Sequence, residues 1–150
     1  MENCSICKRI EMIQNESNPF FIKETKTGYA VFADHQQFHG TVYFYSKKHV
    51  AHLDDLDDET MKDYLFEMAQ LQKAIRLAFG SDHVDCELIG TDDHHLHFQL
   101  FPRMDQDLPL YGENGNGPVY WCPKSCMFSS DNFPSQDDLA FMKKCLNQYF

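Results

Sequence analysis

The chain has 150 residues, of which 43% are hydrophobic and 14% aromatic, and its formal net charge at pH 7 is −10. This length predicts one domain over residues 1–150, and the apolar content is sufficient for a packed core. The negative charge argues against sequence-independent binding of DNA or RNA, which requires a basic surface. An anionic small ligand would need local cations or amide donors to offset the repulsive field.

The sequence shows no pattern of export or membrane insertion. Its first residues lead into a polar stretch, and no run of about 20 apolar residues occurs. We therefore expect a cytoplasmic protein without a membrane partner. Its six cysteines would then lie in a reducing compartment, where close pairs are typical of metal or redox sites.

Hydrophobic periodicity and turn residues predict the secondary structure. Residues 41–46 are β-branched and aromatic, which favours a strand, whereas apolar spacings of three and four over 57–79 favour a helix that ends at Gly80. In chain order, the predicted elements are a helical segment at 4–14, strands at 20–26, 28–33 and 41–46, a helix at 57–79, strands at 84–89 and 95–101, and a helix capped by Ser135.

These elements predict an α+β domain with a roughly five-stranded antiparallel sheet, one long helix and a C-terminal helix. The turn residues at 90–93 should join the last two strands as a hairpin.

Polar and apolar residues alternate in the last predicted strand. His95, His97 and Gln99 should share one face, while the apolar residues between them should lie in the core. A neutral imidazole on a rigid strand is a competent nucleophile toward phosphorus. Arg103, just after the strand, is a cation of the type that phosphate ligands favour. The competing interpretation is a surface strand that carries histidines by chance.

The chain begins with a Cys-x-x-Cys pair, Cys4 and Cys7. A thioredoxin-like motif would follow a strand, so zinc is the better interpretation, and zinc requires two further ligands. Two reduced cysteines at a mobile N-terminus are the simpler alternative. Composition alone does not decide between two sets of partners, the favoured His49 with His95 and the rival Cys122 with Cys126.

The strand from His95 to Arg103 resembles the signature of the histidine triad family, which carries His-x-His-x-His followed by apolar residues and often Pro-Arg. Other segments resemble the family in the same order. Residues 4–7 are similar to its N-terminal zinc pair, residues 32–34 to its strand ending in Asp, and residues 40–49 to its Gly-His-x-Leu-Val-x-Pro-Lys-x-His segment. The resemblance covers most of the chain.

The resemblance implies a histidine triad fold, a homodimer, and a nucleotide hydrolase or nucleotidyltransferase. Its substrates would be nucleoside phosphates or dinucleoside polyphosphates, which would form a nucleotidyl-histidine intermediate on His97. Gln99 and Arg103 would bind the phosphate, and Asp34 would contact the ribose hydroxyls. We expect a backbone carbonyl to hold the other ring nitrogen of His97.

The resemblance also implies a zinc ion, and it selects the Cys₂His₂ set over the Cys₄ set. The ligands would be Cys4, Cys7, His49 and His95. Because all four positions are protein ligands, the zinc would be structural.

The sequence departs from the family pattern at three places. Gln99 replaces the third histidine, as in the transferase and phosphorylase branches, and Thr41 replaces the histidine of the Gly-His pair. Residues 91–94 replace a Gly-Gln-Ser phosphate-binding stretch with a sequence that contains Asp92 and Asp93. These departures motivate an alternative, a zinc-containing nucleotide-binding or regulatory protein with little or no catalysis. A Cys₄ zinc-binding interaction module is a third interpretation.

The glutamine has a chemical consequence. An amide donates hydrogen bonds but cannot give up a proton to a leaving group. Gln99 should therefore favour leaving groups that need no proton, such as phosphate or pyrophosphate, over the amines of phosphoramidates.

Overall fold

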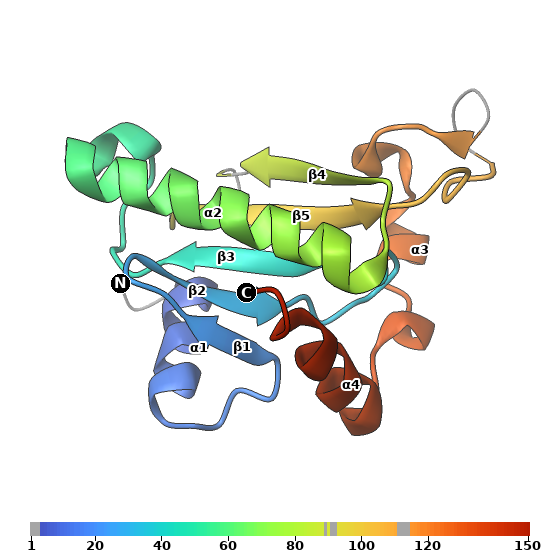
Figure 1. Ribbon diagram of the computed structural model, residues 1–150, viewed down its shortest axis with the longest axis horizontal. Coiled ribbons are helices and arrows are strands. Elements are labelled where there is room, and N and C mark those ends of the chain that lie inside the picture. Colours follow the sequence, from blue (N-terminus) through green and yellow to red (C-terminus); the bar gives the residue numbers. More distant parts are fainter. Residues whose placement is uncertain (1–3, 89, 91–92, 111–114) are drawn as a thin grey trace.

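A five-stranded antiparallel sheet forms the centre of the molecule, in the order β1–β2–β3–β5–β4 (Figure 1). The computed structural model describes residues 4–88, 90, 93–110 and 115–150. The strands are β1 (Phe21–Glu24), β2 (Gly28–Phe32), β3 (Val42–Ser46), β4 (His83–Leu88) and β5 (His97–Arg103). The predicted α+β architecture and its terminal hairpin, β4–β5, are confirmed.

Helices surround this sheet. They are α1 (Ser5–Gln14), α2 (Asp58–Phe79), α3 (Lys124–Met127) and α4 (Gln136–Leu146), together with short 3-10 helices at Leu53–Asp55, Val119–Trp121 and Ser130–Asn132. Figure 1 shows α2 crossing one face of the sheet, with α4 below it on the same side. Among the described residues, no helix is long and apolar enough to cross a membrane.

The long helix has well-defined ends. The Asp57 side chain accepts a hydrogen bond from the backbone N–H of Thr60 at 2.9 Å, which satisfies a free donor of the first turn. Gly80 ends the helix in the left-handed conformation at φ 63°, which glycine adopts without a steric penalty. The predicted helix is therefore confirmed to within one residue.

The core lies between the sheet and α2. Tyr64 of α2 is fully buried, stacks on Phe44 with ring centroids 4.8 Å apart, and donates a hydrogen bond from its hydroxyl to the Phe44 carbonyl at 2.7 Å. Phe98 and Leu100 of β5, with Leu96 before it, are buried as the alternation predicts. Because neighbouring residues of a strand point to opposite faces, the polar residues of β5 lie on the other side of the sheet.

Candidate functional site

The polar face of the sheet carries a pocket that is built around His97. In the β3–β5 ladder Tyr45 lies opposite His97 and Tyr43 lies opposite Gln99, so these four side chains share a face. Helix α1 closes one side, and the hollow has a volume of about 230 Å³. We call it the His97 pocket, and its lining residues are Ser5, Ile6, Arg9, Tyr43, Tyr45, Asp93, His97 and Gln99.

The geometry of His97 fixes the roles of its two ring nitrogens. Nδ1 lies 2.8 Å from the backbone carbonyl oxygen of His95, and because a carbonyl only accepts, Nδ1 must carry the proton. Nε2 therefore keeps its lone pair, and the Gln99 amide nitrogen lies 3.4 Å from it. The expected carbonyl contact is present. The result is a buried, oriented imidazole with an accessible nucleophilic nitrogen beside an amide donor.

Two tyrosines form the neutral wall of the pocket. Burial raises the pKa of Tyr43 to about 12 and also raises the pKa of Tyr45 above its ordinary value. Both side chains therefore remain uncharged phenols at neutral pH. The ring of Tyr45 lies at a centroid distance of 6.1 Å from that of His97 and limits the orientation of the imidazole.

An ion pair that the sequence did not predict lies at this pocket. Arg9 of α1 donates hydrogen bonds to both carboxylate oxygens of Asp34, one of them at 2.8 Å. These bonds raise the pKa of Arg9, so the guanidinium stays charged. The apolar residues of α1, Ile6, Ile10 and Ile13, are buried, and this helical spacing, which places Arg9 at the border of the apolar face, was the available signal. Asp34, expected at the ribose, is thus held by Arg9.

One of the two acidic residues before β5, Asp93, has a structural role. Asp93 accepts hydrogen bonds from the Ser5 hydroxyl at 2.6 Å and from the Ser5 backbone N–H at 3.3 Å. It therefore ties the first turn of α1 to the segment before the signature strand. Asp92 lies outside the described residues.

Four predicted metal ligands meet beside the pocket. One ligand atom from each of Cys4, Cys7, His49 and His95 lies within 4.8 Å of the others. The Cys7 sulfur is 3.1 Å from His49 Nδ1 and 3.4 Å from His95 Nδ1, and the two Nδ1 atoms are 3.2 Å apart. Cys4 caps α1, which places both sulfurs on the first turn of this helix.

This arrangement fits a tetrahedral zinc ion. Zinc bonds of about 2.3 Å to sulfur and about 2.0 Å to nitrogen place neighbouring ligand atoms about 3.3 to 3.8 Å apart. His95 Nε2 lies 2.8 Å from the Ser46 carbonyl, so it carries the proton and Nδ1 presents its lone pair to the cluster. Burial lowers the pKa of His95, which favours the neutral form that binds metals.

The rival cysteines are not part of this cluster. Cys122 is buried in a second hydrophobic cluster with Phe38 and Phe101, and Cys126 is exposed on α3. Within the described part of the chain, no group of three or more potential ligands includes either one. The structure thus brings together the Cys₂His₂ set and not the Cys₄ set.

Arg103, which we expected to bind phosphate beside His97, does not line the His97 pocket. Its guanidinium, 9% exposed, donates hydrogen bonds to Asp107 at 2.7 and 2.6 Å, to Asp85 at 2.7 Å and to the Gly117 carbonyl at 2.7 Å. Arg103 lies six positions after His97 on β5, which is about 20 Å at about 3.3 Å per residue. Arg103 therefore lies away from the pocket because the strand carries it too far from His97.

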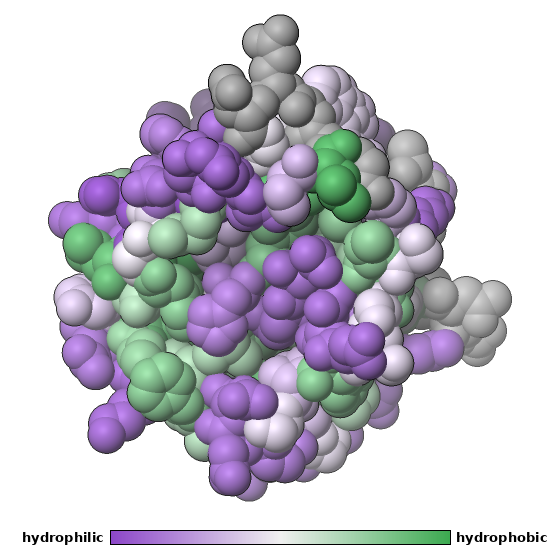
Figure 2. All heavy atoms as spheres, turned by 90° about the vertical axis from the view of Figure 1, so that its right-hand side faces the viewer, coloured by the Kyte–Doolittle hydropathy of each residue, from purple (hydrophilic) through white to green (hydrophobic). Residues whose placement is uncertain are grey.

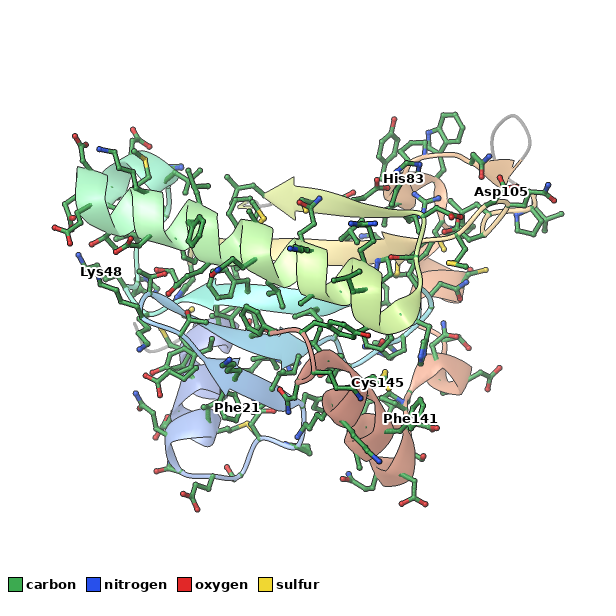
Figure 3. All side chains as sticks on the ribbon, viewed as in Figure 1. Phe21, Lys48, His83, Asp105, Phe141 and Cys145 are labelled. Atoms are coloured by element: carbon green, nitrogen blue, oxygen red, sulfur yellow. The ribbon has the colours of Figure 1, made fainter. Side chains whose placement is uncertain are left out.

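Arg103 instead lines a larger hollow at the other end of the sheet, together with His83 and Asp105. Figure 3 labels both of these residues, and it labels Lys48, the residue before His49 of the Cys₂His₂ cluster, at the opposite end. Figure 2 looks at the Arg103 end of the molecule and shows hydrophilic side chains gathered near the middle of that face.

No family model matches the chain. Among curated proteins, it is similar to the adenosine 5'-monophosphoramidase HNT1 of Saccharomyces cerevisiae, with 29% identity over 104 residues. The match covers 69% of this chain and 64% of the yeast protein, so the chain spans less than two thirds of that relative.

Solved structures share the fold over nearly the whole chain. A histidine triad protein from Sinorhizobium meliloti 1021 has a TM-score of 0.76 at 12% identity and covers 100% of this chain and 99% of its own. A Zn-bound histidine triad family protein from Mycobacterium smegmatis has a TM-score of 0.65 at 14% identity, with 98% and 95% covered. A histidine triad nucleotide-binding protein from Sulfolobus tokodaii has a TM-score of 0.69 at 17% identity, with 95% and 91% covered.

Proposed function

We propose that this chain, which has the fold of the histidine triad proteins, is a nucleotide hydrolase or nucleotidyltransferase that uses His97 as its nucleophile. Its substrates would be nucleoside phosphates or dinucleoside polyphosphates. The observation that carries the proposal is the orientation of His97, whose Nδ1–H is bound to the His95 carbonyl and whose Nε2 lies beside the Gln99 amide.

The reaction would proceed in two displacements. The Nε2 lone pair of His97 attacks the phosphorus, and the bond to the leaving oxygen breaks with its electron pair. The imidazole then carries positive charge, which the Nδ1–H···O bond to His95 stabilises. Water next attacks the phosphorus, the P–N bond breaks with its electrons returning to Nε2, and the proton of water passes to solvent. In a transferase, an acceptor hydroxyl or phosphate oxygen replaces the water.

Gln99 would select the leaving group. It can stabilise phosphate oxygens through its amide N–H, but it cannot protonate an amine. The yeast relative is named a monophosphoramidase, whereas we propose that this chain prefers phosphate or pyrophosphate as leaving groups. Gln99→His should raise turnover of a nucleoside phosphoramidate relative to a dinucleoside polyphosphate, and an unchanged ratio would contradict this assignment.

We further propose that Asp34 contacts the ribose hydroxyls and that a zinc ion holds Cys4, Cys7, His49 and His95 in place. A carboxylate oxygen can accept more than one hydrogen bond, so Asp34 can bind hydroxyls while it is paired with Arg9. The donor set and its distances support a closed structural zinc site. We leave Arg103 out of the substrate site because its guanidinium is held by two carboxylates.

The test of the proposed function compares two neighbouring histidines. His97→Ala should abolish hydrolysis of adenylyl and dinucleoside polyphosphate substrates, while zinc content and thermal stability stay close to those of the unmodified protein. His94→Ala is the matched control because His94 is exposed, and it should retain activity. Mass spectrometry of protein mixed with substrate should detect a nucleotidyl adduct. Undiminished turnover by His97→Ala would overturn the mechanism.

A nucleotide-binding protein without efficient catalysis is the second candidate, and Thr41 is the observation that favours it. Its hydroxyl donates to the Phe38 carbonyl at 2.6 Å and is buried, so it supplies no hydrogen bond to the pocket. Nucleotide binding without turnover or adduct would support this candidate.

We also propose a homodimer. Strand β4 is at the edge of the sheet, and its Leu88 is 47% exposed. On α2, the apolar side chains of Phe66 (64%) and Leu77 (43%) are also exposed, which is typical of an interface. Light scattering coupled to size-exclusion chromatography should give twice the chain mass of 17.6 kDa. A monomer at micromolar concentration would contradict this proposal.

A further inference from the structure

We propose that Arg9 is the phosphate-binding cation of the His97 pocket and that Asp34 positions it. This inference rests on the proposed function and names the charged group that the site would use. It assigns to helix α1 a role that the sequence led us to expect of Arg103.

The position of Arg9 is the first support. Arg9 lines the same hollow as His97 and Gln99, although it comes from the opposite end of the chain. Its side chain is 31% exposed, so it is anchored but open to a ligand. Buried Ile6 and Ile10 hold α1 against the core on either side of it.

The charge balance of the pocket is the second support. Among the described residues that line it, Arg9 alone carries a permanent positive charge, whereas Asp93 is acidic. The chain has a net charge of −10, so a phosphate needs a local cation to offset the field of the whole protein. A guanidinium is protonated at neutral pH, and the hydrogen bonds to Asp34 raise the pKa of Arg9 further.

Hydrogen-bonding capacity is the third support. Asp34 engages one N–H of each terminal guanidinium nitrogen. A guanidinium has more N–H donors than one carboxylate can bind, so the others are available for phosphate oxygens. Arg103 differs, because two carboxylates and a carbonyl surround its nearly buried guanidinium.

The test separates recognition of the phosphate from recognition of the nucleoside. Calorimetry should measure the dissociation constants of AMP and of adenosine for Arg9→Met and for Lys8→Met. Lys8 directly precedes Arg9, is exposed and has the same charge, so it is the matched control. Arg9→Met should weaken AMP binding about tenfold or more beyond any loss of adenosine binding, because it removes the phosphate contact, whereas release of Asp34 from Arg9 acts on the ribose of both ligands alike. Lys8→Met should change neither.

Arg9→Lys provides a second variant that keeps the charge toward Asp34. It should fold normally and bind AMP between the unmodified protein and Arg9→Met, because lysine lacks the planar fork. Equal losses for AMP and adenosine in both variants, or no loss for either ligand, would overturn the inference.

The outcomes also separate this inference from the proposed function. If His97→Ala abolishes turnover while Arg9→Met binds AMP normally, only the assignment of Arg9 fails. If Arg9→Met loses AMP selectively while the unmodified protein shows no turnover, only the catalytic proposal fails.

Discussion

The carbonyl oxygen of His95 accepts the Nδ1–H of His97 at 2.8 Å, while the imidazole of His95 faces the Cys₂His₂ cluster. One residue therefore belongs to the Cys₂His₂ cluster through its side chain and holds the proposed nucleophile through its backbone. Ser46 fixes the same ring from the other side, through its carbonyl at 2.8 Å from Nε2. This relationship links the position of the N-terminus to the orientation of His97.

Metal removal should lower turnover although the metal takes no part in the proposed chemistry. A chelator should reduce both the melting temperature and kcat, the latter by about tenfold or more, because His95 loses its fixed position. Reloading with Zn²⁺ or Co²⁺ should restore both to similar values, as either ion fits a tetrahedral site. The measurement is metal analysis with activity and thermal melting on the same samples. Full activity of metal-free protein would contradict the link.

The choice of ligands can be tested with two cysteines. Cys7→Ser should lose most bound zinc and lower the melting temperature, because a hydroxyl is a poor zinc ligand. Cys126→Ser should retain zinc and stability, since Cys126 is exposed and outside the cluster. Zinc loss in both variants would favour the Cys₄ set instead, because Cys7 belongs to either set and Cys126 only to the Cys₄ set.

The buried hydrogen bond of Tyr64 predicts a measurable loss of stability. Tyr64→Phe keeps the ring stack but leaves the Phe44 carbonyl without this donor, so the free energy of unfolding should fall by about 1 to 2 kcal/mol. Tyr120→Phe is the control because Tyr120 is 76% exposed, and its change should stay within about 0.5 kcal/mol. Urea denaturation of both variants measures the difference.

Arg103 should stabilise the fold without contributing to nucleotide binding. Arg103→Met leaves Asp107, whose side chain is 14% exposed, without its cation, and should cost about 3 to 5 kcal/mol at pH 7. Urea denaturation of the variant and the unmodified protein at pH 7 measures this loss.

Two measurements accompany the Arg103 variant: the stability of Arg76→Met as a control, and the affinity for AMP. Arg76→Met removes an exposed charge from α2 and should leave stability nearly unchanged. The affinity of Arg103→Met for AMP, measured at a temperature at which it is folded, should equal that of the unmodified protein. A selective loss of AMP binding would return the phosphate role to Arg103.

The local pattern of polar and apolar residues was sufficient to predict much of the fold. Alternation placed Phe98 and Leu100 in the core and His97 and Gln99 on the other face, because the side-chain period of a strand is two. The strand was expected to begin at His95, but β5 begins at His97, because the backbone N–H of Leu96 donates to the Val50 carbonyl at 2.7 Å, outside the ladder with β3.

By itself the sequence determined the strands and the long helix, and its resemblance to the histidine triad family predicted the four residues of the Cys₂His₂ cluster. Only the tertiary structure decided which cation lies beside His97. Periodicity assigns a residue to a face, but it gives neither its distance along the strand nor the distant segment that covers it. Arg103 shares a strand with His97 and is too far along it, whereas Arg9, 88 positions away in the chain, lines the same pocket.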